Sequence, residues 1–357
     1  MIKRPSFLIL AWGSAQASSS LALASTAWLL SGLNPSPLLN VLLPVLATVP
    51  LLLPLPQRLR LGYVIQISAL LVLLAVATPW AGHQVLWPLA GVFLLVLGQQ
   101  IGQSPLQQQL QSSQAIPPDA LGTSAEGGRL IGHLLTGLLF PLGKALLQFS
   151  QALVLLLPLA PAMLGLAASP PQPQAAVAAE PEMPGSAGLY LPSLLQGMLF
   201  GSLFALLPLW VRQEGAGNCF DFGMVITAYG LGRSAAAALA SRWRLATPLP
   251  YLLLAVLLAA TQVLPGWGAV ALFVPFGLVA GLSDGNLGRS APQPRDARRR
   301  SKWLERSSSV GGLAGSLLMG LLAQVTALGV ALPLQLVAFV AAALVLPRLA
   351  ATGNPNR

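Results

Sequence analysis

The sequence has few charged residues, since only 8% of its 357 positions are Asp, Glu, Lys or Arg. A water-soluble domain has about 25% charged residues, so this chain lacks the polar groups needed to cover a surface in water. Hydrophobic residues make up 55% of the chain, and its mean hydropathy is +0.73. The composition excludes an ordinary soluble protein and predicts a protein integral to a membrane.

Other scarce residues exclude several kinds of chemistry. The single cysteine, Cys219, cannot form an intrachain disulfide or a cysteine metal site. Two histidines and nine acidic residues, with no paired carboxylates in the apolar runs, provide no metal or hydrolytic centre. The stretch from Gly137 to Lys144 lacks the spacing of a phosphate-binding loop, which excludes ATP-driven transport by this chain alone. We predict no enzyme and no cofactor.

The net charge of +10 does not indicate nucleic-acid binding. The basic residues lie in short gaps between apolar runs, and no basic patch alternates with exposed aromatic residues. Charge in such gaps is typical of the loops that set the orientation of a membrane protein.

Apolar runs of about 20 residues predict an all-α membrane protein with about twelve transmembrane helices. The first run follows Lys3 and Arg4 as a signal peptide would, but it is too long for one, so we expect a retained helix. The predicted spans are residues 7–30, 37–54, 63–81, 85–103, 120–142, 145–167, 188–211, 219–240, 249–264, 267–286, 307–327 and 329–347.

The basic residues support an even number of spans. With the N-terminus in the cytoplasm, 15 of the 19 Lys and Arg residues fall in cytoplasmic loops or tails. Only Lys144 and Arg212 fall in loops on the opposite side of the membrane, and Arg129 and Arg233 lie inside spans. A wrong helix count would scramble this asymmetry. We predict that both termini are cytoplasmic and that the membrane is a bacterial inner membrane.

A linker at residues 169–187, rich in Pro and Ala, separates two predicted six-helix halves, residues 1–168 and 188–357. The halves repeat short patterns. Arg58 and Arg60 precede an apolar span in the first half, and Arg242 and Arg244 do so 184 positions later. The stretch that starts at Gly132 recurs 183 positions later. Two pseudo-symmetric halves place a solute cavity between them.

The six-plus-six pattern resembles the major facilitator superfamily over the whole chain. That family has a Gly-x-x-x-Asp-Arg-x-Gly-Arg-Arg loop between its second and third helices. Here Arg58 fits the loop, while Gln57 stands in place of the acid. The resemblance implies a cytoplasmic loop motif at Arg58 and Arg60, repeated at Arg242 and Arg244.

The stretches Ser104–Leu106, Ile116–Gly122 and Gly128–Gly132 resemble the loop and the helix start of the bacterial drug and siderophore exporters of this superfamily. Their antiporter motif continues as Gly-Pro-x-x-Gly-Gly. Gly132 and Gly137 fit it, whereas His133 replaces the proline and Thr136 one glycine. The resemblance favours export.

Ionisable groups in a bilayer are costly, so each is a candidate for function. Arg233 on the eighth span and Asp284 at the cytoplasmic end of the tenth are expected to be interfacial rather than central. Three residues of the fifth span are candidates for ion coupling. Glu126 and Arg129 lie three positions apart on one helix face and can pair. Either Glu126 exchanges a proton beside Arg129, or the two form a structural pair near the cytoplasmic end. His133 lies deeper, and it is either a proton relay or a hydrogen-bonded neutral imidazole.

Polar uncharged residues predict which faces avoid lipid. Gln16 and Gln196 lie on the first helix of each half, and we predict that both line the cavity. The segment from Arg289 to Arg306 is a basic cytoplasmic loop, interpreted either as a topology signal or as a surface for anionic lipids.

These observations favour a secondary transporter that exports a small amphipathic or drug-like solute, with protons as a candidate coupling ion. The predicted partners are the solute and membrane lipids, without nucleic acid and without an implied oligomer. Two alternatives remain: a non-transporting membrane scaffold or assembly factor of the same fold, and a lipid flippase.

Overall fold

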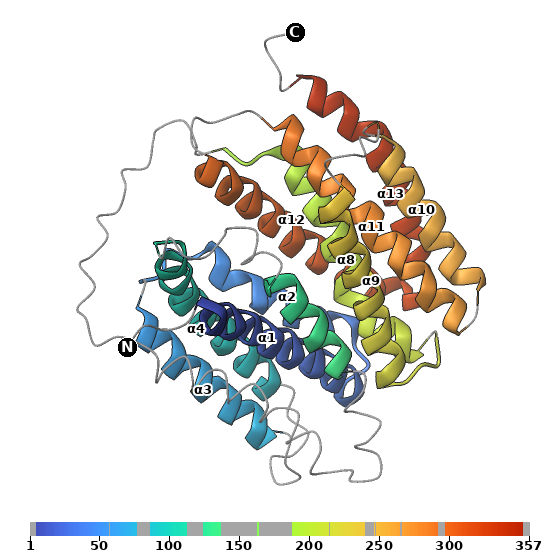
Figure 1. Ribbon diagram of the computed structural model, residues 1–357. Helices are drawn as coiled ribbons and strands as arrows, with labels where there is room; N and C mark the ends of the chain where they lie inside the picture. Colours follow the sequence, from blue (N-terminus) through green and yellow to red (C-terminus); the bar gives the residue numbers. More distant parts are fainter. Residues whose placement is uncertain are drawn as a thin grey trace. The chain divides into compact units, whose positions relative to one another are not determined.

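The computed structural model describes most of the chain, and all its regular elements are helices (Figure 1). The described residues are 5–56, 58–76, 86–112, 124–136, 163, 188–213, 215–239, 246, 248–264, 266–291 and 297–352.

The helices follow the predicted spans closely. Ten helices carry labels from α1 to α13, and residues 124–136 form a further helix without a label. The predicted sixth span, residues 145–167, lies outside the described residues apart from residue 163, so a total of twelve remains a prediction. The named helices are α1 (Pro5–Leu33), α2 (Pro37–Leu52), α3 (Leu59–Val76), α4 (Leu86–Ser112), α8 (Leu191–Gln213), α9 (Cys219–Leu239), α10 (Pro248–Val263), α11 (Trp267–Ser290), α12 (Ala297–Thr326) and α13 (Leu328–Thr352).

The length and apolar composition of the helices suit a bilayer. Among the described residues, four helices are long and apolar enough to cross it, and five more apolar helices are shorter. The four are Leu191–Gln213, Trp267–Ser290, Trp303–Thr326 and Leu328–Leu349. The protein is integral to a membrane, as the composition predicts.

The chain forms two compact units. Unit 1 contains Met1–Asn34 and Val49–Pro181, and unit 2 contains Pro35–Thr48 and Glu182–Arg357. The division between Pro181 and Glu182 falls inside the predicted linker, residues 169–187. Most of α2 belongs to unit 2, although the chain on both sides of it belongs to unit 1. The division into two six-helix halves remains a prediction.

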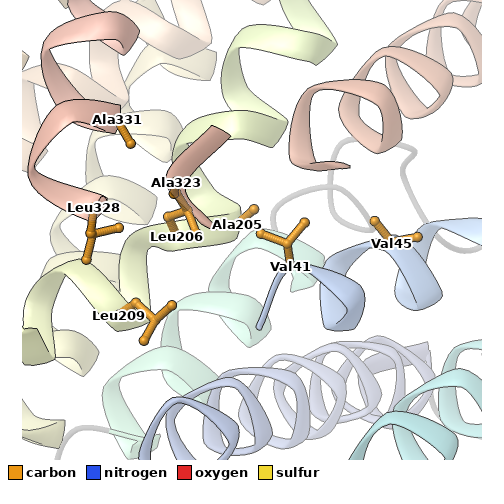
Figure 2. Close-up of a cluster of buried hydrophobic side chains, with 8 residues drawn as sticks. All are labelled: Val41, Val45, Ala205, Leu206, Leu209, Ala323, Leu328 and Ala331. Atoms are coloured by element: carbon orange, nitrogen blue, oxygen red, sulfur yellow. The ribbon is translucent and has the colours of Figure 1, made fainter. Parts of the chain in front are cut away.

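The first turns of α2 pack against α8, α12 and α13. Val41 and Val45 share a buried apolar cluster with residues of those helices (Figure 2). At the start of the helix, the Ser36 hydroxyl donates a hydrogen bond to Gln324 Oε1 at 2.7 Å. The other members of the cluster are Ala205, Leu206, Leu209, Ala323, Leu328 and Ala331.

Glycines bring particular helix pairs into backbone contact. In unit 2, a Cβ on Gly311 of α12 would collide with the carbonyl oxygen of Leu194 on α8. In unit 1, a Cβ on Gly128 would collide with the carbonyl oxygen of Gly13 on α1. Gly128 and Gly311 are 183 positions apart, so the internal repeat extends to the way each unit packs its helices. Small residues at such positions let membrane helices approach closely.

The connection between α12 and α13 contains a strained residue. Ala327 alone separates the two helices and has a φ of 101°. This left-handed backbone is unfavourable for any residue with a Cβ. The predicted division at residues 327–329 therefore lies at a sharp turn.

Replacing this residue with glycine should stabilise the protein. We expect Ala327→Gly to raise the free energy of unfolding by about 1 kcal/mol, because glycine adopts positive φ without strain. The unfolding midpoint in detergent measures the change. Ala331→Gly, inside α13, is the matched control and should lower stability by a similar amount. A loss of stability in both variants would contradict strain at Ala327.

Candidate functional site

Two charged side chains from different helices meet inside unit 2. Arg233 lies on α9 and Asp284 on α11, and guanidinium Nη2 donates a hydrogen bond to carboxylate Oδ2. Each residue is six positions before its helix ends, at Leu239 and at Ser290. The pair therefore lies about 9 Å from both helix ends. Each side chain is 39% exposed, so the pair is packed among helices but remains accessible.

Gln196 of α8 joins this pair to two more helices. Its Nε2 donates hydrogen bonds to Asp284 Oδ1 and, at 3.1 Å, to the Ser283 hydroxyl. The Tyr251 hydroxyl on α10 donates to Gln196 Oε1 at 3.0 Å. Gln196 is 3% exposed, so a single buried amide uses both its donor and its acceptor to connect α8, α10 and α11.

Tyr229 holds the other side of the guanidinium. Arg233 Nη1 donates to the Tyr229 hydroxyl at 3.1 Å, and the guanidinium carbon lies 5.8 Å from the centre of the Tyr229 ring. The ring in turn packs against Phe204, with ring centres 4.6 Å apart. We refer to the connected side chains as the polar network. Its members are Gln196, Tyr229, Arg233, Tyr251, Ser283 and Asp284.

Glycines explain why α9 and α11 come close enough for the ion pair. A Cβ on Gly232 would collide with the carbonyl oxygen of Val274, and one on Gly277 would collide with that of Tyr229. The two backbones therefore touch next to Arg233. This approach brings the short Asp284 side chain within hydrogen-bond reach of the guanidinium.

The polar network can bind a polar group as well as hold helices together. A guanidinium has five N–H donors, and two of them bond within the network. The other three have no partner among the described residues, and the side chain is accessible. Because Asp284 balances the charge of Arg233, the pair can remain inside an apolar bundle, where a lone charge would be costly.

A small apolar cavity lies elsewhere in unit 2. Its volume is about 20 Å³, which is room for about one water molecule. Ser202 and Gln335 form its polar wall, and the Ser202 hydroxyl donates to Gln335 Oε1 at 2.8 Å. The cavity is too small for an amphipathic solute as it stands. The other lining residues include Leu206, Trp210, Phe273 and Met319.

The three predicted coupling residues lie together on the helix of residues 124–136. Arg129 Nη1 and Glu126 Oε1 are 2.9 Å apart, and both side chains are well exposed. His133 Nδ1 is buried and has no hydrogen-bond partner among the described residues. A buried nitrogen without a partner is uncommon and marks His133 as the residue of this helix most in need of an explanation.

The other predicted residues that the structure describes lie on or next to several helices of the two units. Gln16 is buried on α1, in unit 1, and Gln196 belongs to the polar network of unit 2. Arg58 and Arg60 are exposed at the start of α3. Arg242 and Arg244 lie outside the described residues.

Sequence reasoning missed Tyr251 and Ser283, and it treated Arg233 and Asp284 as separate interfacial charges. One signal was present. Two opposite charges lay toward the predicted cytoplasmic ends of the eighth and tenth spans, and such charges tend to pair in a membrane.

The described residues contain no group of three His, Cys, Asp or Glu side chains that could hold a metal ion. No family model matches the chain, and no curated protein matches it.

Solved structures match the chain over nearly its whole length. A bacterial metal transporter has a TM-score of 0.69 at 13% identity, covering 98% of this chain and 99% of its own. The fold is that of the major facilitator transporters. A bacterial homologue of the human lysosomal transporter Spinster, inward-facing and occupied, has a TM-score of 0.66 at 13% identity. The match covers 98% of this chain and 96% of the homologue. A mutant of the nucleoside transporter NupG has a TM-score of 0.65 at 11% identity. The match covers 97% of this chain and 100% of the NupG chain.

Proposed function

We propose that the protein is a secondary transporter that carries a small amphipathic solute out of the cell by alternating access. The main support is the fold, which follows solved transporters of metals and nucleosides over at least 97% of this chain. Those substrates belong to those proteins, and identities of 11–13% do not transfer them.

The polar network is the second support for transport. Ionisable side chains inside apolar helices are costly and are typical of solute and ion pathways. A purely structural bundle has no need for a guanidinium that is 39% exposed and has unused donors. We therefore propose that Arg233 and Asp284 contact the solute's polar group.

Proton coupling is proposed for the helix of residues 124–136. Glu126 is accessible beside Arg129, and His133 Nδ1 is buried without a hydrogen-bond partner among the described residues. Protonation of Glu126 or of His133 would make the net charge of unit 1 more positive by one, and this change can favour one conformation over the other.

Proton flux in liposomes tests both parts of the proposal. Purified protein is reconstituted with a pH-sensitive dye inside, a proton gradient is imposed, and a panel of amphipathic compounds is added. We expect solute-dependent proton flux in the wild type and at least a tenfold loss in the His133→Ala/Glu126→Gln variant. His83→Ala/Glu305→Gln is the matched control and should retain the flux.

The other outcomes separate the alternatives. Flux retained in the His133→Ala/Glu126→Gln variant would keep transport but remove coupling from this helix. Transport of a labelled lipid between leaflets, without flux of soluble compounds, would favour a flippase. Absence of both activities would favour the scaffold, whose motivation is the missing acid at Gln57.

A further inference from the structure

The helix α12 is longer than a membrane span requires. It contains 30 residues, which corresponds to about 45 Å. Its last 20 residues, 307–326, already span the roughly 30 Å hydrocarbon core. The first ten, 297–306, therefore continue beyond the core on the side that the basic residues predict to be cytoplasmic.

Specific contacts fix this extension to unit 2. The Trp303 indole Nε1 donates a hydrogen bond to the carbonyl oxygen of Gly188 at 2.5 Å, and its ring lies 5.2 Å from that of Tyr190. The Tyr190 backbone N–H donates to the Ser307 hydroxyl at 3.0 Å. These contacts show that the side of α12 carrying Trp303 and Ser307 faces the protein.

Four of the five basic residues in the extension occupy one side of the helix, and the fifth, Arg300, falls about 20° from Ser307. At 100° per residue, positions 298, 299, 302 and 306 fall within an arc of about 100°, which begins about 40° from Trp303. All four positions are basic. Glu305 lies next to this arc, and both Glu305 and Arg306 are exposed. Because four basic residues outnumber this one acid, the surface has a net positive charge. We name the four residues Arg298, Arg299, Lys302 and Arg306 the basic stripe.

The height of the basic stripe matches the lipid headgroups. The headgroup layer adds about 5–8 Å on each side of the hydrocarbon core. Position 306 lies at its base and position 302 about 6 Å higher, while positions 298 and 299 lie just above it, within a Debye length. Trp and Tyr are enriched at this level of a membrane, and Trp303 and Tyr190 meet there.

We propose that the basic stripe binds anionic phospholipid headgroups of the cytoplasmic leaflet. A topology signal requires only positive charge in a loop. It requires neither a continuous helix through the headgroup layer, nor anchors to unit 2, nor four of five basic residues within one arc of about 100°. The proposal concerns lipid binding, so it stands or fails independently of the proposed transport activity.

Thermal unfolding with added lipid tests the proposal on the full chain in neutral maltoside micelles. Phosphatidylglycerol should raise the unfolding midpoint at lower concentration than phosphatidylcholine, because a ligand of the folded state stabilises it. High salt should remove the difference. Each basic residue near a surface contributes about fivefold in affinity. We expect Arg298→Gln/Arg299→Gln/Lys302→Gln/Arg306→Gln to need at least tenfold more phosphatidylglycerol.

The matched control removes four basic residues elsewhere, with Arg58→Gln/Arg60→Gln/Arg348→Gln/Arg357→Gln. It should need less phosphatidylglycerol than the stripe variant does, because its four basic residues are spread over three segments of the chain instead of lying on one side of a helix. If the stripe variant does not fold, Lys302→Gln/Arg306→Gln replaces it, with an expected loss of at least fivefold. An unchanged response in the stripe variant, or an equal loss in the control, would overturn the proposal.

Discussion

Replacing Gly311 with alanine should severely destabilise the protein, whereas the same change at Gly312 should be tolerated. A Cβ on Gly311 would collide with the carbonyl oxygen of Leu194, and both atoms belong to helix backbones that cannot rotate away. The helices α8 and α12 must then separate along their whole contact. Overpacking of this kind costs about 1–3 kcal/mol where side chains can adjust, so we expect about 3 kcal/mol or more here.

Gly312 is a control from the next position of the same helix. The nearest atom to a Cβ there is the Gly197 carbonyl oxygen at 3.7 Å, an ordinary contact. Alanine also favours a helix over glycine by about 1 kcal/mol, so Gly312→Ala should be neutral or stabilising. Unfolding midpoints and the yield of monodisperse protein measure both variants. Equal midpoints would show that α8 and α12 are not in backbone contact.

The internal repeat extends this test to unit 1. Gly128 lies 183 positions before Gly311 and faces the Gly13 backbone in the same way. We expect Gly128→Ala to reproduce the effect of Gly311→Ala. The sequence identifies these glycines as packing residues because pairs at four-residue spacing are common in membrane helices. It does not identify their partners, since no local pattern specifies which helix lies opposite.

The positions of the helices could be predicted because a bilayer fixes their length and apolar content. Their ends were less accurate where polar residues prolong a helix. The span predicted at residues 307–327 begins at Ala297, because Ala, Arg, Lys, Leu and Glu all favour a helix. Hydropathy detects the part of a helix inside the membrane and cannot detect its extension into water.

The packing partners of α2 could not be predicted from the sequence. Its residues Pro35–Thr48 belong to unit 2, whereas the predicted halves assign them to the first. Apart from Ser36, Asn40 and Thr48 the segment is apolar, and this composition does not specify which helices lie opposite it. The buried contacts of Val41 and Val45 come from residues more than 150 positions away in the chain.

The polar network was predicted only in part for a similar reason. Gln196 was chosen for its repeat position, and Arg233 and Asp284 were recognised as charges in spans. The backbone contact between α9 and α11 at Gly232 and Gly277 decides that these charges pair. Neither Tyr251 nor Ser283 has a sequence pattern that distinguishes it from the many hydroxyl groups bonded within membrane helices.

The second large effect is expected at the ion pair of this network. Asp284→Ala should lower the free energy of unfolding by about 2 kcal/mol, because it leaves the Arg233 guanidinium without its counter-charge. Removing one partner of a fully buried pair costs about 3–5 kcal/mol, and the exposure of both side chains reduces the figure. Under the proposed function, the same variant should also lose most solute transport.

A double-mutant cycle isolates the pair from other effects of each substitution. Arg233→Leu/Asp284→Ala removes both charges, so its destabilisation should fall short of the sum of the single variants by at least 1 kcal/mol. The control is the cycle on Glu126 and Arg129, an exposed pair three positions apart on one helix. Such pairs contribute only about 0.2–0.5 kcal/mol. Equal coupling in the two cycles would show that the polar network is no stronger than a surface ion pair, and it would remove the structural support for assigning solute contact to Arg233 and Asp284.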